Sequence, residues 1–153
     1  MNAFIVGSLF AGIGGIDLGF KNAGFEIAWA NEIDHKSCAT YKQNFKHNII
    51  CDDIKNITIA SLSNIDILTG GFPCQAFSIA GNKKGFNDER GVIFFELIRL
   101  ATQINPRIIF LENVKNLKSH NDGKTLQYII DAIENLGYYV TYSVLNTCEY
   151  TNI

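Results

Sequence analysis

The sequence predicts a doubly wound α/β domain built on a mostly parallel sheet. Strand-like and helix-like segments alternate along the chain, and the strand-like segments are almost continuously apolar, as strands covered by helices on both faces are. The chain has 153 residues, of which 47% are hydrophobic and 18% are charged. These values suit one globular domain with a core, so we expect a single domain over residues 1–153, with ligands at the carboxyl ends of its strands.

The amino-terminal part is expected to contain four strands and two helices. An apolar segment at 4–10 predicts the first strand. Apolar residues at helical spacing from Ile13 to Ala23 predict the first helix, which Gly24 ends. The other elements expected here are a strand at 25–30, a helix at 35–45, and strands at 48–51 and 65–68.

The carboxyl-terminal part begins with a long irregular segment. Residues 72–91 show no clean period and contain three glycines, and an irregular segment of this length is usually either functional or disordered. The elements expected after it are a helix at 92–104, a strand at 107–111, a helix at 126–136 and a final strand at 138–147.

The cysteines and histidines indicate neither a disulfide scaffold nor a metal site. None of the four cysteines belongs to a C-x-x-C pair, and the three histidines are scattered along the chain. We therefore expect no bound metal, and we expect each cysteine to act alone, by default as a small buried apolar residue. The residues concerned are Cys38, Cys51, Cys74, Cys148, His35, His47 and His120.

Charge and hydropathy predict a soluble, cytoplasmic protein without a membrane partner. No apolar run approaches the roughly 20 residues of a membrane helix, and the amino terminus lacks the pattern of a signal peptide. The formal net charge of −2 argues mildly against strong DNA binding by this chain alone. Lys83, Lys84 and Arg90 form a local basic exception.

A glycine-rich turn, Phe10-Ala11-Gly12-Ile13-Gly14-Gly15, follows the first expected strand. Glycines there let a ligand approach the backbone, and the amino terminus of the next helix favours an anion. The dinucleotide fingerprint requires a third glycine where Asp17 stands, so the match is partial. From these residues alone, a plain tight turn explains the pattern equally well.

Two acidic residues extend the case for an adenosine-containing ligand. Glu32 follows the second expected strand, where a carboxylate can accept hydrogen bonds from ribose hydroxyls. Asp53 follows the third strand and is placed to accept from an adenine amino group, although alone it would be a solvated loop carboxylate. S-Adenosylmethionine has no pyrophosphate, which agrees with the incomplete dinucleotide pattern.

The loop after the fourth strand contains the candidate nucleophile, Cys74, beside Pro73, which stiffens the chain. Reactive cysteines occupy partly exposed, electropositive settings, whereas an isolated Pro-Cys pair is usually structural. The same loop continues through residues that could meet phosphates or simply be solvated. These are Gln75, Ser78, Lys83, Lys84 and Arg90.

Glu112-Asn113-Val114 ends the fifth strand, which neighbours the fourth in most such sheets. A carboxylate after an apolar strand, facing the crevice that holds Cys74, is a candidate acid. The alternative is a helix-capping or salt-bridged surface residue.

Taken in order, these segments resemble motifs I, IV and VI of the DNA cytosine-5 methyltransferases, at 10–15, 73–75 and 112–114. The resemblance covers nearly the whole chain and implies a Rossmann-like, S-adenosylmethionine-dependent fold, double-stranded DNA as substrate, and a restriction–modification setting of bacterial or phage type. The tRNA methyltransferase branch of the family shares both Pro-Cys-Gln and Glu-Asn-Val, so RNA stays open as a substrate.

The resemblance assigns a role to each candidate. Cys74 would add to carbon 6 of a flipped-out cytosine, while Glu112 would hydrogen-bond or protonate the ring nitrogen. Asn113 would fix the Pro73-Cys74 loop. Ile33 stands where the family often has an aromatic residue, so we expect weaker stacking on adenine. Cofactor contacts are implied for Phe10, Gly12, Ile13, Gly14, Gly15, Glu32, Ile33, Asp53, Ile54 and Pro73, and DNA contacts for Gln75, Ser78, Lys83, Lys84 and Arg90.

We also expect the catalytic domain to be partial and incomplete at its carboxyl end. The family's motif VIII, its target-recognition domain and a later strand beside the fifth would all follow residue 153, and unpaired apolar edges would favour association. A split enzyme with a second polypeptide, or a truncated product, would explain this. The alternatives are an inactive remnant that binds S-adenosylmethionine, and a noncatalytic module that pairs with a methyltransferase, against which the presence of both Cys74 and Glu112 argues.

Overall fold

The structure, a computed structural model, describes residues 3–73 and 89–150, and for 89–92 only the backbone. The chain divides into two compact units, Met1–Asn113 and Val114–Ile153, which are described separately. In the described ranges no helix is long and apolar enough to cross a membrane. No group of three or more His, Cys, Asp or Glu side chains there could hold a metal ion.

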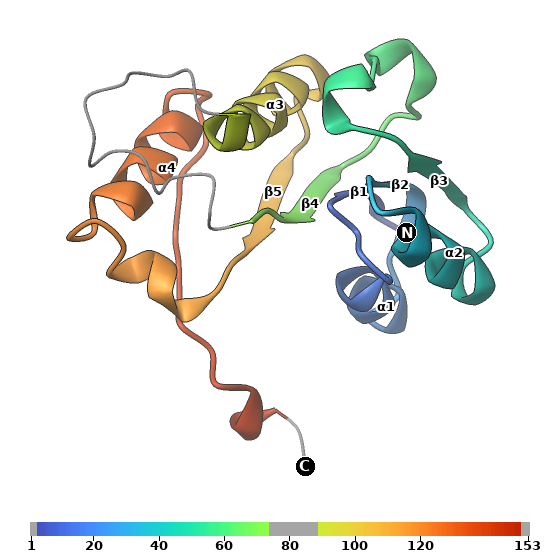
Figure 1. Cartoon of the computed structure of the whole chain (residues 1–153), viewed down its shortest axis with the longest axis horizontal. Helices are drawn as coiled ribbons and strands as arrows, with labels where there is room; N and C mark the ends of the chain where they lie inside the picture. The colour runs from blue at the N-terminus through green and yellow to red at the C-terminus, as the bar shows by residue number, and fades with distance from the viewer. Residues whose placement is uncertain (1–2, 74–88, 151–153) are drawn as a thin grey trace. The chain divides into compact units, whose positions relative to one another are not determined.

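The first unit contains a five-stranded sheet of order β3-β2-β1-β4-β5, in which every neighbouring pair is parallel (Figure 1). The predicted doubly wound architecture is therefore confirmed. The order reverses between β1 and β4, and ligands of such sheets bind at the carboxyl ends of strands beside that reversal. The strands are β1 Ile5–Leu9, β2 Glu26–Glu32, β3 Asn48–Cys51, β4 Ile67–Gly71 and β5 Ile108–Glu112.

Helices cover the sheet on both faces. The connections through α1 (Gly15–Asn22) and α2 (His35–Asn44) run in one direction across the sheet, and the connection through α3 (Glu89–Ile104) runs in the other. Because parallel crossovers are right-handed, α1 and α2 share one face and α3 covers the opposite one, as Figure 1 shows. Two short 3₁₀ turns, η1 (Ile54–Asn56) and η2 (Ile59–Ser61), lie against α3.

The core forms where apolar strands meet these helices. Trp29 of β2 is buried, and its indole Nε1 donates to the Ser63 carbonyl at 3.1 Å. A Cβ atom at Gly7 of β1 would lie 2.3 Å from the Trp29 ring, so Gly7 leaves the space that this ring fills. The largest fully buried side chains are otherwise Tyr41, Phe94, Leu9, Leu68, Leu97 and Leu100.

Three strands extend past their predicted ends by a few residues. β2 continues to Glu32, β4 to Gly71 and β5 to Glu112, because parallel pairing continues through Glu32–Cys51 and Gly71–Glu112. Glu32 and Glu112 are thus the last residues of their strands, where the ladder fixes their backbone, whereas Asp53 follows β3 as predicted.

Two of the cysteines correct a prediction. Cys38 in α2 and Cys51 at the end of β3 form a disulfide, with their Cα atoms 6.2 Å apart. The expectation that each cysteine acts alone is wrong for this pair, because α2 packs over the neighbouring strands β2 and β3 and brings the two side chains into one cluster with Tyr41 and Phe45. Cys148 is free and exposed, which contradicts the default of a buried residue.

The second unit contains η4 (Lys115–Lys118), the predicted helix as α4 (Lys124–Glu134), and η5 (Thr147–Glu149). The predicted strand at 138–147 is wrong: residues 138–146 have no regular secondary structure, and Tyr139 is 92% exposed. A strand requires a neighbour that completes its ladder of hydrogen bonds, and no strand in the described ranges pairs with this segment. An apolar pattern alone does not supply that neighbour.

Candidate active site

The glycine loop between β1 and α1 is a tight turn held from β2. Ala11 donates its N–H to the Asn31 carbonyl at 3.0 Å, and Gly12 donates to Glu32 Oε2 at 2.8 Å. Phe10 and Gly12 both have a φ of 55°, in the left-handed region. Two hydrogen bonds to β2 therefore fix the shape of the loop.

The three glycines of this loop serve different purposes. A Cβ atom at Gly14, where φ is 97°, would lie 2.2 Å from the Phe45 ring, so this glycine allows α1 to pack against α2. Among the described residues, no atom lies within 4 Å of a Cβ added at Gly12 or Gly15. Close approach of a ligand to the backbone requires such space.

Glu32 lies between the glycine loop and the start of α2. Its Oε1 accepts from the N–H groups of Ile33 and Asp34, both at 2.9 Å, while its Oε2 accepts from Gly12. A carboxylate oxygen accepts two hydrogen bonds, so Oε2 retains capacity for one more. The carboxylate thus organises two loops and can still accept a hydrogen bond from a ligand hydroxyl.

The loops after β1, β2 and β3 also carry apolar and acidic side chains that the sequence singled out. Ile13 and Ile33 are each 62% exposed, which is high for side chains of this size. Asp53 is half-buried and its Oδ1 accepts from the Lys55 N–H at 3.0 Å, so it caps η1. Ile54 is buried in the core, which leaves its backbone as the part of this residue that a ligand can reach.

This edge fits an adenosine-type cofactor by the chemistry of its groups. It combines an open glycine surface, a carboxylate oxygen with spare capacity at Glu32, and two exposed aliphatic side chains at Ile13 and Ile33. A purine needs apolar contact on its faces, and a ribose needs acceptors for its hydroxyls. S-Adenosylmethionine meets both descriptions.

A second group of residues gathers at the ends of β4 and β5. Gly71 pairs with Glu112, and a Cβ atom at Gly71 would lie 3.1 Å from Glu112 Oε2, so the carboxylate lies directly beside this glycine. A Cβ atom at Gly70 would lie 2.9 Å from the Leu9 carbonyl and 3.3 Å from the Phe10 ring. These glycines let the ends of β1, β4 and β5 meet at the point where the strand order reverses.

Asn113 extends this arrangement toward the candidate nucleophile. Its Nδ2 donates to the Phe72 carbonyl at 2.7 Å, and Phe72 is buried while Pro73 is exposed. The carbonyl that Asn113 holds belongs to the residue two positions before Cys74. The side chains of Cys74, Gln75, Ser78, Lys83, Lys84 and Arg90 lie outside the described residues.

Sequence reasoning missed Asn31 and Gly71. Asn31 is 2% exposed, and its side chain donates to two backbone carbonyls beyond β3 and within it. One feature of the sequence could have pointed to Asn31: it is a polar residue directly before Glu32, at the end of a strand that is otherwise mostly apolar. Gly71 lies beyond the strand expected at 65–68, and its proximity to Glu112 depends on strand pairing, which the sequence does not state.

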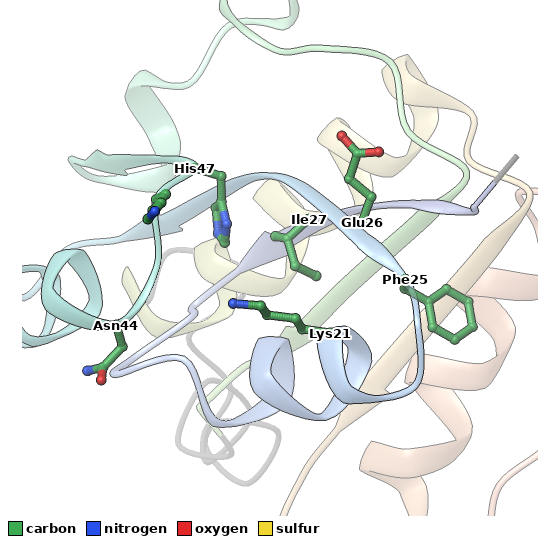
Figure 2. A pocket seen from close by; sticks show the side chains of 7 residues that line it. Lys21, Phe25, Glu26, Ile27, Asn44 and His47 are labelled. Atoms are coloured by element: carbon green, nitrogen blue, oxygen red, sulfur yellow. The ribbon is translucent and has the colours of Figure 1, made fainter.

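The hollow drawn in Figure 2 lies elsewhere. It has a volume of about 370 Å³ and is lined by the amino end of β2, the carboxyl ends of α1 and α2, and the segment before β3. It therefore lies at the amino edge of the sheet, away from Glu32 and Glu112. Its lining residues are Lys21, Phe25, Glu26, Ile27, Asn44, Lys46 and His47.

A buried polar chain accompanies this hollow. Asp17 is fully buried and accepts from the Tyr41 hydroxyl, which also contacts His47 Nε2. Burial, and then the hydrogen bond to Asp17, raise the pKa of Tyr41, while burial lowers the pKa of His47. Lys21 Nζ lies 5.8 Å from the centre of the Phe45 ring. These contacts join α1 to α2, so we assign the cluster to packing.

Comparison with known proteins gives a family match over nearly the whole chain. The family of C-5 cytosine-specific DNA methylases matches residues 4–152. The Type II methyltransferase M.Bsp6I of Bacillus sp. (strain RFL6) is 51% identical over 97% of this chain and 48% of its own length. The Type II methyltransferase M.Eco47II of Escherichia coli is 45% identical over 90% of this chain and 33% of its own.

A solved structure of a methyltransferase has a similar fold. DNMT2 of Spodoptera frugiperda superposes with a TM-score of 0.64 at 27% identity, over 85% of this chain and 41% of that one. The chain thus spans between a third and a half of the length of the relatives named here. Because the family match extends from the first strand to the end of the second unit, the chain belongs to the C-5 cytosine-specific DNA methylase family.

Proposed function

We propose that this chain carries the cofactor-binding and bond-forming part of a DNA cytosine-5 methyltransferase, and that a further segment or polypeptide recognises the target. One observation carries the proposal: the Glu112 carboxylate lies beside Gly71, while the next residue, Asn113, holds the backbone that leads to Cys74. An acid and a nucleophile on neighbouring strand ends are what covalent activation of cytosine needs.

The chemistry follows from the weakness of carbon 5 of cytosine as a nucleophile. The thiolate of Cys74 adds to carbon 6, and Glu112 hydrogen-bonds or protonates the ring nitrogen N3, so that electron density moves to carbon 5. S-Adenosylmethionine, the cofactor of this family, supplies the methyl group when bound. The carbon 5 proton then passes to water, the Cys74 sulfur departs as the thiolate, and N3 returns its proton to Glu112, which releases 5-methylcytosine.

The position of Glu112 suits this role. Glu112 is exposed at the end of β5, where a base that has left the duplex could reach it. Flipping is required because carbon 6 is shielded in a stacked duplex, and it costs a few kcal/mol. The proposal assigns phosphate contacts, which would offset part of that cost, to Ser78, Lys83, Lys84 and Arg90.

Two observations support a further segment or polypeptide: the length of the relatives and the exposed apolar side chains of β5. The matched relatives extend well beyond the region that this chain covers. Ile108 and Phe110 of β5, at the edge of the sheet, are 47% and 49% exposed. An apolar edge strand of this kind favours pairing with another chain or segment. Target recognition, the DNA sequence chosen and a role in restriction and modification in the bacterial cytoplasm belong to the complete assembly.

The test is transfer of a labelled methyl group from S-adenosylmethionine to mixed-sequence DNA. The chain is assayed alone and with the carboxyl-terminal remainder of M.Bsp6I, and the Cys74→Ser variant is the control. Transfer that requires Cys74 supports the proposal. If Cys74→Ser transfers as well as the parent chain, the proposed nucleophile is wrong. If the chain binds S-adenosylmethionine but transfers no methyl group, either alone or with the added polypeptide, it is an inactive remnant.

A further inference from the structure

The ends of β1 and β3 are both joined to one residue of β2, Asn31. This side chain is 2% exposed, and its Nδ2 donates to the Ile50 carbonyl at 3.0 Å and to the Asp52 carbonyl at 2.8 Å. Its own backbone carbonyl accepts from the Ala11 N–H at 3.0 Å. A buried carboxamide that uses both of its N–H bonds on carbonyls of another segment fixes the path of that segment.

The path that Asn31 fixes leads directly to Asp53. After Cys51 the chain leaves the sheet, and the second hydrogen bond holds it at Asp52. The Asp52 side chain in turn accepts from the Asp53 N–H at 2.7 Å and from Asn56 Nδ2 at 2.8 Å. Asp53 then caps η1. The turn at 52–56 is therefore built outward from the carboxamide of Asn31.

The neighbouring residue, Glu32, performs the equivalent task on the other side. Its carboxylate accepts from Gly12 and so holds the glycine loop. Side chains alternate between the faces of a strand, so Asn31 and Glu32 leave β2 in different directions. Together they set the distance between the glycine loop and the Asp53 turn, which are the two walls of the expected adenosine site.

We propose that Asn31 is a positioning residue for the cofactor, which sets the Asp53 turn against the glycine loop and thereby determines affinity for the adenosine part of S-adenosylmethionine. This inference rests on the proposed cofactor site. It assigns Asn31 no contact with the reacting atoms, so its replacement changes cofactor affinity and leaves the rate at saturating cofactor nearly unchanged.

The test compares Asn31→Leu, which keeps the branched shape of the side chain but removes both donors, with Ile27→Val, which weakens the core at the far end of the same strand. S-Adenosylmethionine binding is measured by calorimetry. Because two hydrogen bonds are lost, we expect about a tenfold rise in Kd for Asn31→Leu. Ile27→Val lowers Tm and leaves Kd unchanged. Equal Kd values for parent and Asn31→Leu overturn the proposal.

Amide hydrogen exchange of the ligand-free chain provides a second readout, which does not depend on the proposed function. Asn31→Leu is expected to speed exchange at 52–56, where the two lost hydrogen bonds held the chain, and Ile27→Val is not. Faster exchange spread evenly over the sheet would show a merely structural role and overturn the proposal. If the parent chain binds no S-adenosylmethionine, the proposed cofactor function fails in this chain, and the exchange pattern still decides the role of Asn31. Asn31→Ser, which keeps a small polar group, replaces Asn31→Leu if the latter does not fold.

Discussion

The edge of the sheet at which the parallel strands end has two halves that are built by different means: the cofactor half, at β1, β2 and β3, and the catalytic half, at β4 and β5. At the ends of β1, β2 and β3, the side chains of Asn31 and Glu32 bind backbone groups of neighbouring loops and fix their shape. At the ends of β4 and β5, two glycines create space and Asn113 donates to the Phe72 carbonyl. The cofactor half is thus shaped by side chains of β2 that hold two loops, and the catalytic half by the close approach of strand ends that glycines permit.

The largest effect is expected on the catalytic half, at Glu112. Glu112→Gln keeps the shape of the side chain but removes the acid, and the loss of one general acid costs about 100-fold or more in rate. We expect methyl transfer by the active assembly to fall by at least that factor, while the Kd for S-adenosylmethionine, measured by calorimetry, stays the same. An equal loss in both quantities would show that the two halves are not separable.

Two glycine substitutions test the cofactor half. Gly14→Ala places a Cβ atom 2.2 Å from Phe45 at a φ of 97°, so we expect a loss of about 3 kcal/mol of unfolding free energy from overpacking and backbone strain. The Cβ of Gly15→Ala meets no neighbouring side chain in the part of the chain that the structure describes, and the residue begins a helix, so the substitution should raise stability by about 0.5 kcal/mol.

The two variants separate packing from binding. Chemical denaturation gives the stability, and calorimetry gives the Kd for S-adenosylmethionine. Gly15→Ala is expected to weaken binding, because its added methyl group occupies the open surface above the loop. Unchanged affinity in this more stable variant would contradict the placement of the cofactor above Gly15.

A smaller effect is expected from Asn113→Ala. The substitution removes the hydrogen bond to the Phe72 carbonyl, and we expect methyl transfer to fall about tenfold, which corresponds to about 1.4 kcal/mol. Cofactor affinity should not change. Asn113→Ala removes a carboxamide from the catalytic half, and Asn31→Leu removes one from the cofactor half, so the two variants should affect rate and cofactor affinity separately. Reversed effects, with Asn113→Ala acting on Kd and Asn31→Leu on rate, would contradict the division.

The smallest effect concerns the amino edge, where burial lowers the pKa of His47 below its ordinary value of 6.5. The folded chain then holds fewer protons than the unfolded chain in the range just below pH 6.5, so stability increases as pH rises through that range and decreases as pH falls. Nearby charges are Asp17, which favours the protonated ring, and Lys21, which disfavours it. Denaturation of His47→Gln at several pH values between 5 and 7 should show a flatter dependence. If the free energy of unfolding depends on pH equally in the parent chain and in His47→Gln, other titratable groups cause that dependence.

The sequence predicted most of the fold because its signals are local. The apolar strands at β1 and β3 and the periodic helices α2 and α4 lie close to their expected ranges. The predictions failed where structure depends on a distant neighbour. The segment at 138–146 has an apolar pattern but no paired strand in the described ranges, and Cys38 meets Cys51 only after α2 has packed over β3.

The candidate site shows the same limit. The types of residue at Glu32, Asp53 and Glu112 indicated acceptors at strand ends. The hydrogen bonds of Asn31 to residues 19 and 21 positions away could not be read from the sequence, because they depend on the register of β2 against β3. Strand pairing likewise determines that Gly71 lies beside Glu112.

The strand order also has a consequence for how the chain folds. β1, β2 and β3 are joined by short crossovers, so these three strands can pair as soon as the first 51 residues have left the ribosome. β4 arrives later, and its contact with β1 spans 61 positions, as the Ile5 N–H to Asp66 carboxylate bond shows. Closing a long loop costs entropy before its contacts form, so we expect the β1–β2–β3 sheet to form first. Pulse-labelled hydrogen exchange during refolding should therefore find protection at Trp29 and Ile49 before Leu68 and Ile109.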